Sequence, residues 1–239
     1  MLYRAEIVYH YTGNTSLDSD LAIKIHGAAM RCMSSATVEK LHLPQYHALS
    51  MYCLSDNAGN ITLHISALDA ESGNVIAKLI TLPSIQIYGS NVPLVQVQAK
   101  VKPASSLDVL TKALHNREVK LIFATPTVYK TAGKYTAPPS PEKYFYSVIR
   151  KMNQFSGIAY TYEEFLQAWA QCRVKEYELY TKAHLVTGYT YTGMTGNMTL
   201  VLPKEAAAAQ RMKEVLCYAV YSGLGSKTAQ GMGGFQILS

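Results

Sequence analysis

The stretch GLGSKTAQGMGGF, residues 223–235, ends four residues before the end of the chain. Five of its thirteen residues are glycine, one is lysine and none is acidic. It lies between a strongly predicted helix at 203–223 and the last predicted strand, FQIL. Glycines permit positive φ and a close approach of the backbone to a ligand. Successive N–H groups in such a loop form a concavity for phosphate oxygens, and Lys227 adds a positive charge.

Two nucleotide-binding motifs share features with this stretch, and neither fits it. A P-loop requires glycine directly before the lysine and a strand before the loop. Here Ser226 precedes Lys227, and a predicted helix precedes the loop. A dinucleotide-binding fingerprint fails for the same reason of topology. A flexible surface turn remains the alternative to a phosphate-binding loop.

The second half of the chain alternates predicted strands and helices. Ser140 as N-cap and Pro141 at the first position predict one helix start, and a capping box from Thr161 to Glu164 predicts another. Gly188 marks a turn between two long strands. The predicted elements are a strand at 119–130, helices at 140–156 and 161–172, strands at 174–186 and 188–202, the helix at 203–223 and the strand at 235–238.

The first half has the same order of elements. Pro44 and Pro83 end predicted helices, and Asn57-Ala-Gly59 is typical of a hairpin turn. The predicted elements are a strand at 2–11, helices at 17–33 and 36–42, strands at 47–56 and 60–68, a helix at 69–83 and a closing strand region within 84–101.

Each half therefore follows the order β-α-β-β-α-β, which is the ferredoxin-like arrangement. The sequence predicts an α+β protein of two tandem ferredoxin-like domains, at residues 1–105 and 116–239, with a glycine-rich loop at 223–234. The polar segment 103–118 is the predicted connector, with one short helix.

Composition limits the classes of function. The formal net charge is +6 and the pI is about 9.0, which favours a phosphate-rich partner. The four cysteines show no CxxC spacing, so we expect free thiols and no zinc framework. The N-terminus reads as a strand, and no apolar run has the length of a membrane span. We therefore expect a soluble cytoplasmic protein that does not bind a membrane.

The glycine-rich stretch, placed between a helix and a final strand, resembles the loop of CRISPR-associated RAMP proteins. More narrowly, the chain resembles the CRISPR repeat endoribonuclease family (Cas six). Two further segments are similar to that family, namely FATPTVYK with the following PPSPEKYFYSVIRKMNQFSG, and IHGAAMRC with the downstream LH at 41–42. In element order the resemblance covers nearly the whole chain.

The resemblance implies a metal-independent endoribonuclease that binds CRISPR repeat RNA and cleaves precursor crRNA without a cofactor. The substrate's 2′-OH is then the nucleophile, and the products carry 2′,3′-cyclic phosphate and 5′-OH ends. The alternative is a non-catalytic RAMP-type subunit that holds guide RNA in a CRISPR effector complex. A general single-strand RNA-binding module is a third interpretation. Association with other Cas effector proteins and a homodimer both remain open.

Histidine suits both proton transfers of this reaction near neutral pH. In the family the acid/base histidine ends a short second helical piece, which implies His42 here. His26 lies inside the first predicted helix and His47 just after Pro44, and each has a structural role as the alternative. A metal site built from these three histidines lacks an obvious further ligand.

The remaining catalytic candidates are Tyr46, which would position a hydroxyl, and a stabilising cation. Some family members carry a lysine at the position of His47, but this chain has no lysine from 41 to 77. The cation must therefore come from elsewhere, with Lys40, Lys24 and protonated His47 as candidates.

The predicted RNA-binding residues lie in the glycine-rich loop and on two basic surfaces. Lys182 belongs to a strand pair that interleaves lysine with tyrosine, which suits stacking of unpaired bases but also fits an ordinary solvated hairpin. Arg150 and Lys143 share one face of the helix at 140–156, where a solvated face is the simpler account. The full set is Gly223, Gly225, Ser226, Lys227, Thr228, Gln230, Gly231, Gly233, Lys182 and Arg150.

Overall fold

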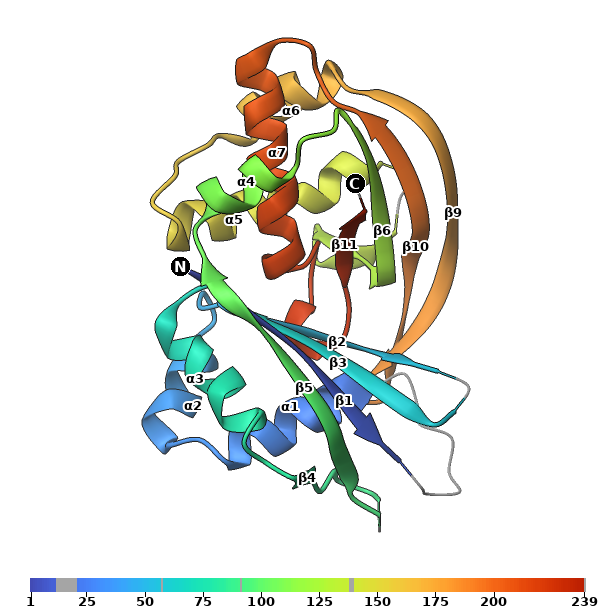
Figure 1. The fold of residues 1–239 in the computed structure, drawn as a ribbon. Helices are drawn as coiled ribbons and strands as arrows, with labels where there is room; N and C mark the ends of the chain where they lie inside the picture. Colours follow the sequence, from blue (N-terminus) through green and yellow to red (C-terminus); the bar gives the residue numbers. More distant parts are fainter. Residues whose placement is uncertain (12–20, 57, 91, 138–139, 239) are drawn as a thin grey trace.

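The computed structural model describes residues 1–11, 21–56, 58–90, 92–137 and 140–238. Figure 1 shows two sheets, each with helices against one face, and the second half of the chain stacked on the first. The paired strands of both sheets run antiparallel. Among the described helices, none has the length and apolar character needed to cross a membrane.

The first half is a ferredoxin-like unit. Its larger sheet has the order β2-β3-β1-β5-β4, so that β1 lies between β3 and the closing strand β5. The elements are β1 (Leu2–His10), α1 (Leu21–Arg31), α2 (Ser35–Leu41), β2 (Leu49–Ser55), β3 (Asn60–Ala67), α3 (Ala70–Leu79), β4 (Ser84–Ile85) and β5 (Leu94–Ser105).

The second half repeats this topology with the strand order β11-β6-β10-β9, and adds a separate pair, β7 with β8. Helix α4 (Leu107–Ala113) connects the two halves. The other elements are β6 (Glu118–Thr127), β7 (Tyr129–Thr131), β8 (Lys134–Thr136), the 3-10 turn η1 (Pro141–Tyr144), α5 (Phe145–Phe155), α6 (Tyr162–Ala170), β9 (Arg173–Val186), β10 (Tyr189–Val201), α7 (Ala206–Ser222), η2 (Thr228–Gln230) and β11 (Phe235–Leu238).

Period-two alternation explains how β1 joins the first core. Ala5, Ile7 and Tyr9 are fully buried and share a hydrophobic cluster with Ile25 of α1 and Val75 of α3. Successive side chains of a strand point to opposite faces, so this spacing directs all three toward the helices. Burying each large side chain stabilises the fold by roughly 1.5–3 kcal/mol.

Aromatic residues form the centre of the second core. Phe145 of α5 contacts Phe165 of α6, with 5.3 Å between ring centroids, and Phe235 of β11, with 6.0 Å. Phe235 also contacts Phe123 of β6, at 5.7 Å. The last strand is therefore fixed by packing as well as by its pairing with β6.

The helix starts test two capping predictions, and α2 has a further cap that was not predicted. Thr161 and Glu164 form the predicted capping box at the start of α6. Ser34 accepts a hydrogen bond from the Thr37 N–H at the start of α2, and such caps stabilise by about 1 kcal/mol. Ser140 and Pro141 occupy the predicted N-cap and first positions, but the first turn is a 3-10 turn and the Ser140 side chain makes no capping hydrogen bond.

Several predicted boundaries need correction. The strand expected over 119–130 is interrupted, since β6 ends at Thr127 and β7 pairs with β8 in another sheet. The closing strand β5 runs to Ser105, and the expected short helix of the connector follows as α4. Residues 17–20 of the first expected helix and Asn57 of the hairpin turn lie outside the described residues. The division into domains at 1–105 and 116–239 stays a prediction.

The two halves are joined by buried polar contacts to α7. The Arg4 guanidinium, on β1, donates to the Val220 carbonyl at 3.0 Å. The Ser50 hydroxyl, on β2, donates to the Tyr221 carbonyl at 2.6 Å. The polar face of the first sheet therefore packs on the end of α7, directly before the glycine-rich segment.

Candidate active site

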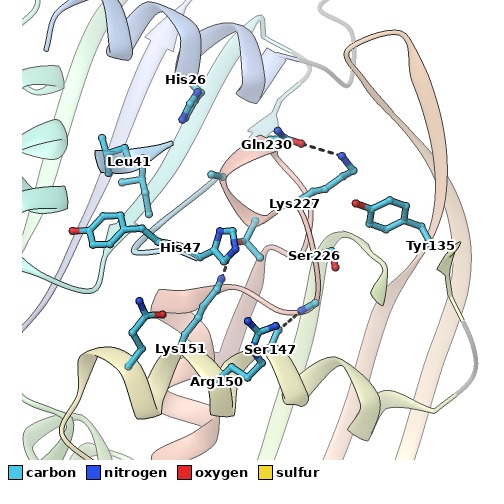
Figure 2. A pocket seen from close by; sticks show the side chains of 16 residues that line it. His26, Leu41, His47, Tyr135, Ser147, Arg150, Lys151, Ser226, Lys227 and Gln230 are labelled. Carbon is cyan, nitrogen blue, oxygen red and sulfur yellow. Dashed lines mark hydrogen bonds between the residues drawn. The ribbon is translucent and has the colours of Figure 1, made fainter. Parts of the chain in front are cut away.

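A pocket of about 400 Å³ opens between the two halves. Figure 2 shows His26 of α1 on one side, Arg150 and Lys151 of α5 on the other, and Lys227 and Gln230 of the glycine-rich segment beside them. The lining includes His26, Leu41, Tyr46, His47, Tyr135, Ser147, Arg150, Lys151, Gln154 and residues 225–230.

The charges of this pocket have one sign. Its described lining holds three basic residues, Arg150, Lys151 and Lys227, with two histidines and no aspartate or glutamate. Clustered positive charge in a concave site with low-dielectric walls attracts anions. The pocket is therefore suited to a phosphate group.

The glycine-rich segment, residues 223–234, is packed tightly between the two halves. A Cβ at Gly225, where φ is +70°, would lie 2.1 Å from the Val128 carbonyl oxygen. A Cβ at Gly234 would lie 2.6 Å from the ring of Tyr52, on the opposite domain. Glycine is required here because neighbouring protein atoms occupy the space of any side chain.

The expected row of open backbone N–H groups is largely absent. The Gly225 N–H donates to Ser147 Oγ at 2.8 Å, the Ser226 N–H to the Val128 carbonyl at 2.8 Å, and the Gly233 N–H to the Pro126 carbonyl at 3.1 Å. The Gly223 N–H donates to the Ala219 carbonyl at 2.9 Å. For these positions the predicted phosphate concavity is wrong, because the donors bind the protein itself.

The predicted RNA-binding residues fall into two groups in the structure. One group lines the pocket, namely Gly225, Ser226, Lys227, Thr228, Gln230 and Arg150. The other is not part of the pocket lining: Gly223, Gly231 and Gly233 are buried, and Lys182 is exposed on β9.

Lys227 is held by aromatic rings. Its Nζ lies 4.7 Å from the ring centroid of Tyr191 on β10 and 5.2 Å from that of Tyr135 on β8. Its backbone is left-handed, with φ of +62°, an uncommon conformation for a residue other than glycine. The cation–π contacts hold the lysine at the pocket wall, where Gln230 Oε1 accepts from it at 3.3 Å.

His26 and His42 are neighbours across α1 and α2. Their ring centroids lie 6.1 Å apart in an edge-to-face arrangement. Burial, with a smaller contribution from His42, lowers the pKa of His26 to about 4. His26 is therefore neutral at pH 7 and faces the pocket, whereas His42 is exposed beside it and is not part of the pocket lining.

His47 approaches the pocket from the segment between α2 and β2. Figure 2 shows its ring next to the end of the Lys151 side chain. Partial burial of the imidazole lowers the pKa of His47, and the charges of Lys151 and Arg150 lower it further. His47 is thus unsuited to be the stabilising cation that the sequence left open.

Tyr46 and Lys40 are directed toward α3. The Tyr46 hydroxyl donates to the Asp69 carboxylate, and Lys40 forms an ion pair with Glu71. Burial and the Asp69 hydrogen bond raise the pKa of Tyr46 to about 12. Tyr46 lines the pocket with its hydroxyl engaged elsewhere, and Lys40 does not line it, so the structure supports neither predicted role.

The sequence analysis missed Lys151. This residue is 6% exposed, lines the pocket, and donates from Nζ to the Ser222 carbonyl at 2.6 Å and to Thr228 Oγ1 at 2.8 Å. Burial, together with Arg150, lowers the pKa of Lys151 to about 7. A signal existed in the sequence, because position 151 lies three residues after Val148 and adjoins Met152 on the apolar face of α5.

A metal site built from the three histidines finds no support in the described part of the chain. Within residues 1–11, 21–56, 58–90, 92–137 and 140–238, no group of three or more His, Cys, Asp or Glu residues is placed to hold a metal ion.

The fold and the pocket define a class of protein in which two tandem ferredoxin-like units enclose a positively charged pocket. Comparison narrows this class. The profile described as CRISPR-associated endoribonuclease Cas6 matches residues 121–235. The Cas6 of Streptococcus thermophilus is 24% identical over 224 residues, covering 91% of each chain, and that of Mycobacterium tuberculosis is 22% identical over 221 residues, covering 89% of this chain and 70% of the relative.

Solved structures agree on the fold. A Cas6 product complex superposes with a TM-score of 0.78 at 19% identity, covering 100% of this chain and 99% of that one. Thermus thermophilus Cas6 gives a TM-score of 0.75 at 21% identity, with coverage of 100% and 98%. The resemblance to the Cas6 family that the sequence indicated is thereby confirmed.

Proposed function

We propose that this protein is an endoribonuclease that binds CRISPR repeat RNA and cleaves precursor crRNA. One observation carries the proposal: a pocket between the domains combines two histidines with three basic residues and, within the described lining, no carboxylate. Relatives over about nine-tenths of the chain are named CRISPR-associated endoribonuclease Cas6, and the similar structures include a Cas6 product complex.

The proposed reaction is a metal-independent transesterification. The ribose 2′-oxygen attacks the adjacent phosphorus and loses its proton, and the bond from phosphorus to the 5′-oxygen breaks. The leaving 5′-oxygen takes up a proton. Atoms and electrons balance within the RNA, leaving a 2′,3′-cyclic phosphate and a 5′-OH. The protein supplies a proton acceptor, a proton donor and positive charge for the phosphorane.

We assign the leading acid/base role to His42, as the family resemblance implies. His26, which is neutral at pH 7 because of its lowered pKa, lines the pocket beside it and is the second candidate. His47 is the third candidate, with its ring beside Lys151 in the same pocket. Arg150 and Lys227 supply charge for the RNA backbone.

The substrate of this activity is a cellular transcript, so we place the activity in the cytoplasm. Association with Cas effector proteins and formation of a homodimer stay predictions. The proposed mechanism uses only residues of this chain.

The test is cleavage of labelled repeat RNA from the protein's own genome in the presence of EDTA. His42→Ala is compared with His115→Ala, an exposed histidine in the connector. We expect His42→Ala to lower the cleavage rate by about 100- to 10,000-fold and the control to leave it unchanged. A substrate with 2′-deoxyribose at the cut site should resist all variants.

Three outcomes would contradict parts of this assignment. Cleavage that survives His42→Ala moves the role to His26 or His47. Tight binding of repeat RNA without cleavage favours a subunit that holds guide RNA. Equal affinity for repeat and scrambled RNA favours a general single-strand RNA-binding protein.

A further inference from the structure

Lys151 is a buried cation for which the proposed chemistry so far has no use. It stands on α5 in the second domain, and Figure 2 shows its side chain rising from that helix into the pocket. It contacts the last residue of α7, through the Ser222 carbonyl, and the middle of the glycine-rich segment, through the Thr228 hydroxyl. The lysine thus connects α5 to the glycine-rich segment at the floor of the pocket.

The two hydrogen bonds of Lys151 use only two of the N–H groups of its ammonium. A protonated lysine carries three N–H donors. Two of them reach Ser222 and Thr228, at 2.6 and 2.8 Å. The third has no acceptor among the described residues, and Nζ lies at a pocket of about 400 Å³.

The buried position of Lys151 is energetically unfavourable for an ammonium group that has no counter-charge. Burying a charge without a counter-charge is unfavourable by several kcal/mol. The described lining offers no carboxylate, and Arg150 stands close by and would repel the charge. A neutral amine has two N–H donors, which are enough for Ser222 and Thr228, so these two contacts alone do not require the charged form of the lysine. An anion in the pocket would supply both the missing acceptor and the missing charge.

We infer that the third N–H of Lys151 donates to a non-bridging oxygen of the scissile phosphate, and that Lys151 is a catalytic residue stabilising the phosphorane. This inference rests on the proposed function. Lys151 would be the stabilising cation, for which residues 41–77 contain no lysine. It belongs to the second domain, whereas the histidines belong to the first. The ammonium keeps its proton throughout, since the proton transfers belong to the histidines.

Bound phosphate should also change the protonation of Lys151. A pKa of about 7 leaves the free lysine only partly charged at neutral pH, and a neighbouring anion favours the charged form. The titratable or charged groups that face Lys151 are His47 from the α2–β2 segment, Arg150 on α5, His26 on α1, Lys227 on the glycine-rich segment and Tyr218 on α7, whose hydroxyl donates to the Lys151 carbonyl.

The kinetic test uses Lys151→Met, which keeps the length of the side chain without its charge. The matched control is Lys112→Met on α4, an exposed lysine paired only with Asp108. We expect Lys151→Met to lower kcat by about 100-fold, as loss of a donor to a developing oxyanion does, with a much smaller change in KM. Lys151→Arg should restore part of the rate, and Lys112→Met should have no effect.

A purely structural lysine would behave differently. Thr228→Val removes one of the two protein partners and leaves the charge in place. If Lys151 only holds the segment, Thr228→Val and Lys151→Met should lower kcat and the melting temperature in parallel. That result, or full kcat in Lys151→Met, overturns the inference. A loss of kcat that is much larger in Lys151→Met than in Thr228→Val, at a similar loss of melting temperature, supports it.

A second measurement does not depend on cleavage. In protein with ¹³C-labelled lysine, the Cε resonance of Lys151, assigned by its loss in Lys151→Met, is titrated with pH, with and without inorganic phosphate. We expect phosphate, and more strongly a 2′-deoxy repeat RNA, to raise the Lys151 pKa by about 1 unit or more. An unchanged pKa with both ligands overturns the contact. If the wild type does not cleave yet this pKa rises, the anion contact stands and the nuclease proposal falls.

Discussion

In each domain one segment connects the last helix of the ferredoxin-like unit, α3 or α7, to the closing strand. These two connecting segments are built differently. In the first domain, residues 80–93 run from α3 to β5, and a Cβ at Gly89 would meet nothing within 4 Å. In the second domain the glycine-rich segment runs from α7 to β11, and a Cβ at Gly225 would meet a carbonyl oxygen at 2.1 Å. Both glycines have positive φ, of +80° and +70°.

This difference teaches what the glycines are for. At Gly89 glycine serves only the turn, whereas the glycines of the second connecting segment let its backbone pass between the domains. The second connecting segment thereby reaches the pocket, where Ser226, Lys227 and Thr228 lie opposite the histidines of the first domain. The two domains share one topology, but the first supplies the candidate acid/base histidines and the second supplies the positive charge.

The largest expected effect on stability comes from placing a side chain in each of the two connecting segments. Gly225→Ala should lower the free energy of unfolding by about 3 kcal/mol, because a left-handed residue is strained and its Cβ collides with backbone. Gly89→Ala should cost about 1 kcal/mol, for strain alone. Denaturant unfolding of the wild type and both variants gives the two losses of unfolding free energy. Equal losses would show that the second connecting segment is not tightly packed.

A second prediction concerns the charge beneath the glycine-rich segment. Unfolded Lys151 keeps its proton up to its usual pKa of 10.5, whereas the folded residue loses it above about 7. Between these values the unfolded state binds more protons, so stability should rise with pH. We expect the wild type to gain about 2 kcal/mol relative to Lys151→Met from pH 7 to pH 9.

Urea unfolding of the wild type and Lys151→Met at a series of pH values gives this difference, and contributions from other groups cancel in it. Parallel stability curves for the two proteins would mean that Lys151 keeps its ordinary pKa and that the segment lies over a solvated charge.

A third prediction concerns RNA binding by the glycine-rich segment. Lys227→Gly removes the charge and the left-handed strain together, so stability should change by less than about 1 kcal/mol. The affinity for a non-cleavable repeat RNA should fall, and the slope of log affinity against log salt should shrink by about 1. Titrations at several salt concentrations test this. An unchanged slope would place Lys227 outside the RNA interface.

The smallest expected effect on activity comes from a substitution in the first domain. Tyr46→Phe removes the hydrogen bond to Asp69 and should lower stability by about 1 kcal/mol. The cleavage rate should not change, because that hydroxyl is directed toward α3 and away from RNA. A large loss of cleavage at normal stability would restore the role that the sequence gave Tyr46.

The local part of this fold could be predicted from the sequence, because its signals are local. Alternation in β1, the Thr161–Glu164 capping box and the order of elements in each half depend on near neighbours. The candidate histidines also lie within one short region. His26 and His47 do line the pocket, and His42 lies beside His26.

The rest depended on contacts between distant residues. Tyr46 and Lys40 engage Asp69 and Glu71 of α3, which no local pattern indicates. The glycines indicated flexibility, yet their neighbours in space require close packing. Lys151 faces the pocket only because α5 packs against α7, and a basic residue on an amphipathic helix is ordinarily read as solvated.

The most direct test of the account is the chemistry of the RNA ends after cleavage of repeat RNA in EDTA, measured by mass spectrometry. The account predicts one 5′ fragment ending in a 2′,3′-cyclic phosphate and one 3′ fragment beginning with a 5′-OH. Fragments with 3′-OH and 5′-phosphate ends, or no cleavage of a tightly bound repeat, would contradict it.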